Sequence, residues 1–246
     1  MYLLVCNAGS TSLKFKLFEM PAEKVLAEAK VERIGRRNNG IFTYKNPVCN
    51  GERHLEKVDI PTYTEGIQLF LDCMLSDDET IGALSDISKI EKVGFKTVLA
   101  PGYSVHVIDE QVEARMREFL DVAPAHNGPY LEAVSHFRKL LPDAVLVGAF
   151  ETAFHETIPL ERKIYAVPYE WYEKYGFQRM GYHGASHSYV SETIELKFGS
   201  TDKMISCHLG GSCSLCAIDE GKSVDTTFGL SLQNGICHAN RCGDLD

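Results

Sequence analysis

No run of apolar residues in this chain approaches the ~20 residues that a helix needs to cross a bilayer. The longest apolar runs, such as residues 144–150, are far shorter than that. The N-terminus lacks the basic residues of a secretory signal and leads directly into a polar turn. Positive charge is also scarce, because 25 Lys and Arg stand against 34 Asp and Glu, a net charge of −9. These absences predict a cytoplasmic protein with no membrane partner and no broad nucleic-acid binding.

Signs of disorder or of fibrous repeats are absent as well. The chain is 44% hydrophobic and 24% charged, which is typical of a globular protein. Its 246 residues can form one large domain or two smaller ones. A change in pattern near residues 150–160 favours two domains, 1–150 and 151–246. The second, of roughly 95 residues, is small for a finished domain.

Cysteine is plentiful, which raises the hypothesis of a zinc site. Five of the eight cysteines lie between residues 207 and 242. Cys213 and Cys216, together with Cys237 and Cys242 and with His208 and His238 nearby, could supply four ligands. However, the first pair points to opposite faces of a predicted strand, and the second pair has a four-residue gap. We therefore favour reduced, structural cysteines over zinc ligands.

Two strands joined by a small polar turn occur twice in the chain. In the first copy, residues 2–6 and 13–18 flank the turn 7–12, and in the second, residues 204–208 and 213–218 flank the turn 209–212. Backbone N–H groups and hydroxyls in such turns bind anions, and glycine admits a phosphate closely. One such turn usually only reverses the chain. Two, one in each domain, predict a cleft that holds a polyphosphate from both sides.

The remaining patterns place further strands and helices along the chain. Thr62 and Glu65 form a capping box at the start of a helix, and Asn38–Gly40 and Asn50–Gly51 indicate hairpin turns. Further helices are predicted at 112–120, from 127 onward and at 186–198. Further strands are predicted at 92–99, at 144–150 with both faces buried, at 163–167 and at 222–226.

Motifs spread over residues 7–244 resemble, in order and spacing, those of the acetate kinase family. They are Asn7-Ala-Gly-Ser-Thr-Ser-Leu-Lys14, Ala149-Phe-Glu-Thr-Ala-Phe-His155, Pro168-Tyr-Glu-Trp-Tyr172, Gly181-Tyr-His-Gly-Ala-Ser-His187, Cys207-His-Leu-Gly210, Gly221-Lys-Ser-Val-Asp-Thr226 and Arg241-Cys-Gly-Asp244. The resemblance implies an α/β fold of the actin-like ATPase (ribonuclease H-like) type, with two duplicated domains and the nucleotide between them. It also implies that the second domain is incomplete, because the family continues well beyond Asp246 with the adenosine pocket and a C-terminal helix.

The resemblance further implies transfer of the γ-phosphoryl group of ATP, with Mg²⁺, to a short-chain carboxylate such as acetate, giving an acyl phosphate and ADP. By position in the motifs, the catalytic residues would be Lys96, Glu151, His183 and Arg241. The nucleotide and its phosphates would be bound by Asn7, Ser10, Ser12, Lys14, His208, Gly210, Gly211 and Ser212. The acyl pocket would be lined by Val98, Ala125, Tyr182 and Leu232. The metal would be held by Asn7 and Glu151.

The chain departs from the family pattern at several of these positions. Phe95-Lys96 replaces a His-Arg pair, so the charge is kept but the planar fork is lost. Leu99-Ala-Pro101 replaces His-Gly-Gly, and Glu151 replaces an aspartate. A shift of ~1 Å in a reacting group is costly. Gly211-Ser212 replaces an Asn-Gly pair, which moves the glycine of the second turn.

Two hypotheses follow from the matches and the departures. In the first, the chain is an acetate kinase-like phosphotransferase whose remaining part is either supplied by a complementary C-terminal chain or lost by truncation. In the second, it is a non-catalytic relative that binds phosphate, a nucleotide or a complementary chain. We expect little acyl phosphate synthesis from the chain alone. We also expect association, as a homodimer or with the complementary chain, because an incomplete second domain exposes apolar surface.

Overall fold

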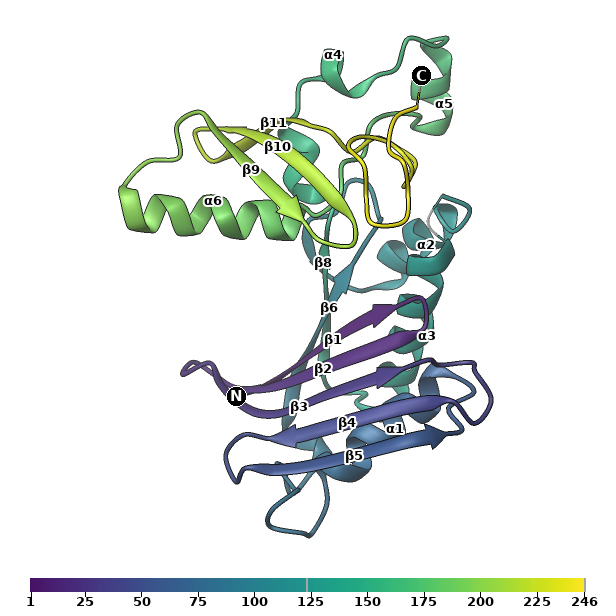
Figure 1. Cartoon of the computed structure of the whole chain (residues 1–246), viewed down its shortest axis with the longest axis vertical. Coiled ribbons are helices and arrows are strands. Elements are labelled where there is room, and N and C mark those ends of the chain that lie inside the picture. Colours follow the sequence, from purple (N-terminus) through teal and green to yellow (C-terminus); the bar gives the residue numbers. More distant parts are fainter. Residues whose placement is uncertain (123, 246) are drawn as a thin grey trace. The chain divides into compact units, whose positions relative to one another are not determined.

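The computed structural model describes residues 1–122 and 124–245, which form two compact units. Unit 1 comprises Met1–Thr97 and Val105–Ala149, and unit 2 comprises Val98–Ser104 and Phe150–Asp246. Figure 1 shows the chain coloured along its sequence, with unit 1 in purple to teal and most of unit 2 in green to yellow. The domain boundary predicted after residue 150 stays a prediction.

Unit 1 is built on an eight-stranded sheet with the order β5-β4-β3-β2-β1-β6-β8-β7. The first five strands form an antiparallel meander, whereas β6 lies parallel to β1. This arrangement, visible in Figure 1, places β1 in the middle of the sheet. The strands are β1 (Tyr2–Gly9), β2 (Ser12–Glu19), β3 (Lys24–Glu32), β4 (Gly40–Asn46), β5 (Gly51–Val58), β6 (Ile90–Thr97), β7 (Val105–Val107) and β8 (Val145–Phe150).

Helices α1 (Tyr63–Met74) and α3 (Pro124–Leu140) pack against the strands of this sheet, and α2 (Glu110–Glu118) packs against α3. The short helix η1 (Ile87–Lys89) leads directly into β6. The alternation of β2 turns Leu13, Phe15 and Leu17 to the helix side, where all three are buried. The ring of Phe15 stacks on Phe70 of α1, with 4.5 Å between the ring centroids. The predicted capping box is confirmed, since Thr62 caps α1 and the Glu65 carboxylate accepts from the Thr62 backbone.

Unit 2 contains a three-stranded antiparallel sheet with the order β11-β10-β9. Its strands are β9 (Met204–Leu209), β10 (Cys213–Asp219) and β11 (Lys222–Thr226). Its helices are η2 (Ala153–Thr157), α4 (Leu160–Lys163), α5 (Glu170–Tyr175) and α6 (Gly184–Phe198). Helix α6 packs against β9 and η2, and η2 packs against β11. Units 1 and 2 therefore share an antiparallel meander in which three consecutive strands lie in chain order.

The first predicted turn, over residues 7–12, is wrong. Asn7, Ala8 and Gly9 continue β1, and only Ser10 and Thr11 form the turn before β2 begins. The reason is that the ladder persists to the pair Gly9–Ser12, and it buries Ala8 beside Leu13 on the helix side. A two-residue connection is the shortest common link between antiparallel strands.

Three other predicted elements also differ. Residues 163–167 are no strand, because helix α4 begins directly after Pro159 and ends at Lys163, and only Ile164 makes an isolated bridge. Strand β8 is not buried on both faces, since it alternates and leaves Val145 40% exposed. Helix α3 begins at Pro124 rather than at 127, because proline suits the first turn of a helix.

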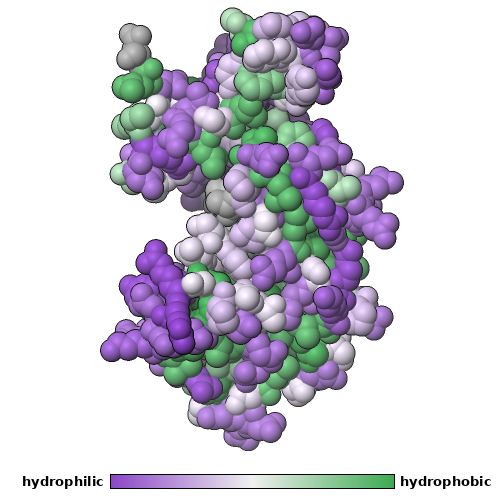
Figure 2. All heavy atoms as spheres, turned by 90° about the vertical axis from the view of Figure 1, so that its right-hand side faces the viewer, coloured by the Kyte–Doolittle hydropathy of each residue, from purple (hydrophilic) through white to green (hydrophobic). Residues whose placement is uncertain are grey.

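The surface of the molecule is mixed in polarity. Figure 2 shows hydrophilic side chains interspersed with hydrophobic ones over the face that it displays. Within residues 1–122 and 124–245, every helix is too short or too polar to cross a membrane. In unit 2, the exposed large apolar side chains include Leu196 and Phe198 at the end of α6, and Ile205 and Leu209 on β9.

Candidate functional site

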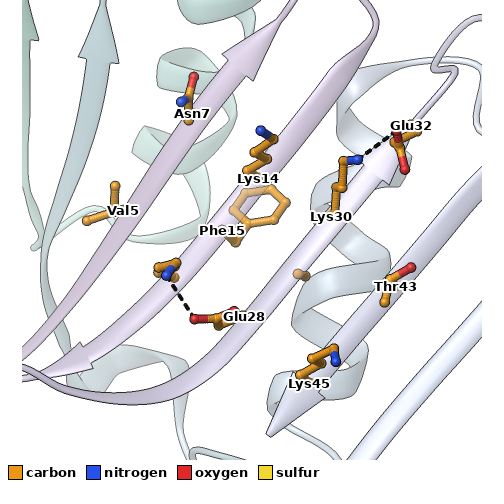
Figure 3. Close-up of a pocket in the computed structure, with 11 residues that line it drawn as sticks. Val5, Asn7, Lys14, Phe15, Glu28, Lys30, Glu32, Thr43 and Lys45 are labelled. Atoms are coloured by element: carbon orange, nitrogen blue, oxygen red, sulfur yellow. Dashed lines mark ion pairs between the residues drawn. The ribbon is translucent and has the colours of Figure 1, made fainter. Parts of the chain in front are cut away.

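In unit 1, the predicted phosphate ligands Asn7 and Lys14 lie opposite each other on β1 and β2. Both line a cavity of about 560 Å³ whose other lining residues come from β1, β2, β3 and β4. Figure 3 shows the lysine and glutamate side chains of β2, β3 and β4 that surround it. Charged side chains thus surround a cavity whose lining also includes the apolar Val5, Phe15 and Ala29.

Lys14 differs from its neighbours around this cavity in its pairing. Lys16 lies 2.9 Å from Glu28 (Nζ to Oε1), and Lys30 lies 2.8 Å from Glu32. Within the described residues, Lys14 has no carboxylate within ion-pair distance. Its exposed ammonium is therefore the cation of this cavity that can meet an incoming anion without breaking an ion pair.

Asn7 is oriented by helix α3. The hydroxyl of Tyr130 donates to Oδ1 of Asn7 over 2.9 Å, which leaves the amide NH₂ of Asn7 as a donor group. Ser10 stands exposed in the two-residue turn, and Ser12 is half-buried opposite Gly9. Neither serine lines the 560 Å³ cavity.

The other predicted residues before 151 are more dispersed. Lys96 is half-buried near the end of β6, between the buried Phe95 and Thr97. Val98 belongs to unit 2 and is buried. The side chain of Ala125 lies outside the described residues, so its assignment stays a prediction.

In unit 2, two predicted histidines meet face to face. The rings of His183 and His208 stack with 3.9 Å between their centroids and 17° between their planes. Nδ1 of His183 lies 2.9 Å from Oγ of Ser214, and Nδ1 of His208 lies 3.0 Å from Oγ of Ser186. The ring of Phe228 meets His183 edge-on. Because His183 adopts a left-handed backbone (φ 59°) just before α6, its ring is fixed by both the chain and its neighbours.

Arg241 is held by both arms of its guanidinium. Nη1 donates to the carbonyl oxygen of Leu232, and Nη2 donates to Oγ of Ser212 over 2.8 Å. The structure therefore brings together Arg241, Ser212 and the backbone of Leu232, three of the predicted site residues. A lysine could not make this two-armed contact.

His238, which the sequence analysis considered only beside the candidate zinc ligands, contacts the turn after β9. Its Nδ1 accepts from the backbone N–H of Cys213 over 2.8 Å, so Nε2 carries the proton of the neutral ring. Nε2 lies 3.3 Å from the carbonyl oxygen of Asn234. Its role in this turn was not readable from the sequence, because its partners Ser212 and Cys213 lie about 25 residues earlier in the chain.

The two glycines of that turn supply space rather than an unusual backbone. Gly210 and Gly211 both lie outside the left-handed region. A Cβ on Gly211 would meet no atom within 4 Å, and both residues are exposed. The bend therefore leaves open room directly beside Ser212, which a bulky group can approach.

Glu151 and Tyr182 are two buried residues of unit 2, and Tyr182 lies in the segment directly before α6. Glu151 is 6% exposed, and its carbonyl oxygen accepts from the N–H of Gly184 over 2.9 Å. The Tyr182 hydroxyl donates to the carbonyl oxygen of Leu230 over 2.8 Å, and burial raises the pKa of Tyr182. The hydroxyl of Tyr182 is thus bound to the backbone, which leaves the aromatic ring for apolar contacts.

Two further histidines lie deep in unit 2. His155 is 1% exposed, with Nδ1 at 2.9 Å from Oγ of Ser223 and Nε2 at 2.9 Å from the carbonyl oxygen of Tyr182. His187 is fully buried, and its two nitrogens lie near Oγ of Ser206 and Oγ of Ser214. Burial lowers the pKa of each histidine to about 4, so both are neutral at pH 7.

His187 could have been found from the sequence. It lies in the same Gly181–His187 motif as His183, one residue into the helix predicted from residue 186. Ser214 could have been found from the alternation of its strand, which turns it to the buried side. Among the described residues, no cluster of three or more His, Cys, Asp or Glu is arranged to hold a metal ion.

Comparison with known proteins decides the relationship. The acetokinase family matches residues 2–246. The chain belongs to this family. It is 40% identical to the acetate kinase of Halothermothrix orenii over 251 residues, which cover 100% of this chain and 62% of that protein. The similarity implied by the sequence motifs is therefore confirmed.

Solved structures of family members have the same fold. The acetate kinase of Porphyromonas gingivalis superposes with a TM-score of 0.88 at 34% identity, covering 100% of this chain and 61% of that chain. A propionate kinase of Francisella tularensis subsp. tularensis gives a TM-score of 0.88 at 28% identity, covering 100% and 62%. The predicted α/β, actin-like fold is thus confirmed. The chain spans about three fifths of the length of the relatives that it matches.

Proposed function

We propose that this chain forms the phosphate- and carboxylate-binding part of a phosphotransferase that uses ATP to phosphorylate a short-chain carboxylate such as acetate. Membership of the acetokinase family supports this proposal. The observation that carries it is the two-armed anchoring of Arg241 beside the open Gly210–Gly211 bend, next to Ser212. The products would be an acyl phosphate and ADP.

The chemistry of this reaction explains why such groups are needed. A carboxylate oxygen attacks the γ-phosphorus of ATP, a new P–O bond forms, and the P–O bond to ADP breaks. Both reactants are anions, so catalysis consists of alignment and charge neutralisation. Arg241 uses two of its five N–H donors on Leu232 and Ser212, and the remaining donors can bind the carboxylate or the equatorial phosphoryl oxygens.

The predicted ligand residues carry the types of chemical group that bind ATP and Mg²⁺. Mg²⁺ prefers oxygen ligands, keeps several waters, and needs only one or two carboxylates besides the phosphates. Glu151 offers a carboxylate, and Asn7 offers an amide whose oxygen already accepts from Tyr130. Lys14, Ser10 and Ser12 would bind phosphates in unit 1, and the bend after His208 would do so in unit 2. When bound, Mg²⁺ would neutralise phosphate charge.

His183 would donate a hydrogen bond to the group in transfer. Its ring is stacked on His208 and held at Nδ1 by Ser214, so little ordering remains to be done when the substrate arrives. Lys96 would supply a further positive charge. The methyl group of acetate would contact the apolar side chains of Val98, Ala125, Tyr182 and Leu232.

A trapping assay tests the proposal. The chain is incubated with ATP, Mg²⁺ and acetate, propionate or butyrate, and hydroxylamine converts any acyl phosphate to a coloured hydroxamate. We expect little product from residues 1–246 alone. We expect more when the C-terminal two fifths of the Halothermothrix orenii acetate kinase is added as a separate chain. Arg241→Ala is the matched negative control, since it removes the anchored guanidinium.

The result that contradicts the proposal is equally clear. If neither mixture forms hydroxamate with any of the three acids, and the chain binds no nucleotide in calorimetry, it is not part of such an enzyme. Light scattering of the same samples measures whether a homodimer or a complex with the added chain forms.

A further inference from the structure

A continuous chain of buried hydrogen bonds leads to His183 from inside unit 2. Oγ of Ser206 lies 2.9 Å from Nδ1 of His187, and Nε2 of His187 lies 2.8 Å from Oγ of Ser214. Oγ of Ser214 in turn lies 2.9 Å from Nδ1 of His183. His187 and Ser214 are 0% exposed and Ser206 is 4% exposed. Four side chains from β9, β10 and the start of α6 are thus joined in one line.

The number of protons in this line limits how it can be arranged. Each serine hydroxyl donates one hydrogen bond, and each neutral imidazole carries one N–H. Burial keeps His187 neutral at pH 7, since its pKa lies near 4. Ser214 lies between two rings with a single proton, so it can donate to His183 or to His187 but not to both. The position of the proton on the ring of one histidine is therefore coupled to its position on the ring of the other.

Two directions of donation are consistent with these distances. In the first, Ser206 donates to His187, His187 donates through Nε2 to Ser214, and Ser214 donates to Nδ1 of His183. In the second, every donor is reversed. The reversed line leaves the buried hydroxyl proton of Ser206 without an acceptor among the described residues. A buried donor without an acceptor is unfavourable, so the first direction is favoured.

We infer that Ser214 and His187 are positioning residues, which together fix the proton of the His183 ring on Nε2 when that ring carries a single proton. This inference rests on the proposed function, in which that N–H donates to the phosphoryl group during transfer. A ring with its proton on Nδ1 would present a lone pair to the anionic phosphate, which would repel it. The buried line therefore selects the ring form that can stabilise the transfer.

The first test measures the proton directly and needs no enzymatic activity. The chain is labelled with ¹⁵N-histidine, and long-range ¹H–¹⁵N correlation spectra are recorded at neutral to mildly alkaline pH. His183→Gln assigns the His183 signals. We expect the shift of an unprotonated nitrogen at Nδ1 and of a protonated nitrogen at Nε2. A proton found on Nδ1 of His183 overturns the inference.

The second test removes the link and uses a matched control. Ser214→Ala should move the His183 shifts toward averaged values, because the hydrogen bond at Nδ1 is then lost. Ser223→Ala removes an equally buried hydroxyl from β11, where it faces His155, and should leave the His183 shifts unchanged. If Ser214→Ala leaves them unchanged as well, Ser214 does not select the ring form. Ser214→Thr keeps the hydroxyl and should restore the original shifts, which separates its effect from general loosening.

A kinetic readout separates this inference from the proposed function. In a preparation that forms hydroxamate, Ser214→Ala should lower kcat about tenfold, the equivalent of one hydrogen bond, with little change in the KM for the carboxylate. Equal kcat values for Ser214→Ala and Ser223→Ala would overturn the inference. If the spectra agree with our expectation but no preparation forms hydroxamate, the proposed function fails while the proton assignment stands.

Discussion

Acidification should destabilise unit 2 through His155 in particular. This imidazole is 1% exposed, and its pKa is lowered from 6.5 to about 4, mainly by burial. In the unfolded chain the ring regains its ordinary pKa and binds a proton below pH 6.5. The unfolded state therefore binds more protons than the folded state between pH 6.5 and pH 4. Stability is fully present above pH 6.5 and falls as the pH drops through this window.

The size of the effect follows from the two pKa values. Between pH 7 and pH 5, the difference in proton binding of this one ring lowers the free energy of unfolding by about 2 kcal/mol. Below pH 4 the loss levels off at roughly 3 kcal/mol for the same group. His187, whose pKa is lowered to about 4 as well, adds a loss in the same direction.

The assay uses the single tryptophan of the chain, Trp171 in α5, which reports on unit 2. Urea unfolding is followed by its fluorescence at pH 7 and pH 5 for the natural chain and for His155→Gln. Because glutamine does not titrate, the variant should lose about 2 kcal/mol less over this interval. His54→Gln, at an exposed position in β5 of unit 1, is the control and should behave like the natural chain.

Equal losses for the natural chain and His155→Gln would refute this reasoning. If His155→Gln is too unstable to measure, an NMR titration of the natural chain answers the same question. The His155 ring should then remain neutral until about pH 4, and protonation near pH 6.5 would contradict the burial argument.

Three other substitutions test separate features. Gly184→Ala should cost more than about 2 kcal/mol in urea unfolding, because its Cβ would collide with a backbone carbonyl, and a neutral result would contradict this packing. Lys96→Arg should raise the rate of hydroxamate formation in an active preparation by restoring the planar fork, whereas the exposed Lys92→Arg should not. Replacing Leu196 and Phe198 by serine should reduce self-association in light scattering, since both are more than 70% exposed. Unchanged scattering would show that this end of α6 is not a contact surface.

Local signals in the sequence predicted local structure well. The Thr62 capping box and the Asn50–Gly51 hairpin were readable because each is decided by residues within a few positions. The burial of 144–150 was misread because it depends on what covers each face of the sheet, which the apolar run itself does not encode. The turn at 7–12 was misread because small polar residues can also continue a ladder when their partners fit.

The candidate site was predictable only in part, for the same reason. Motif positions indicated His183 and Arg241, yet nothing in the motifs indicated what holds them. The anchors of Arg241 are a backbone carbonyl and a serine from other segments of unit 2, and the partner of His183 comes from β10. Such contacts depend on how distant segments fold together, which pattern and spacing along the chain do not encode.

The brevity of the Ser10–Thr11 connection constrains how this chain can vary. One inserted residue there would shift the pairing of β2 by one position and exchange the two sides of the strand. Leu13, Phe15 and Leu17 would then face water, and Lys14 and Lys16 would be forced beneath the helices. Substitutions in this two-residue turn are therefore tolerated more readily than insertions or deletions.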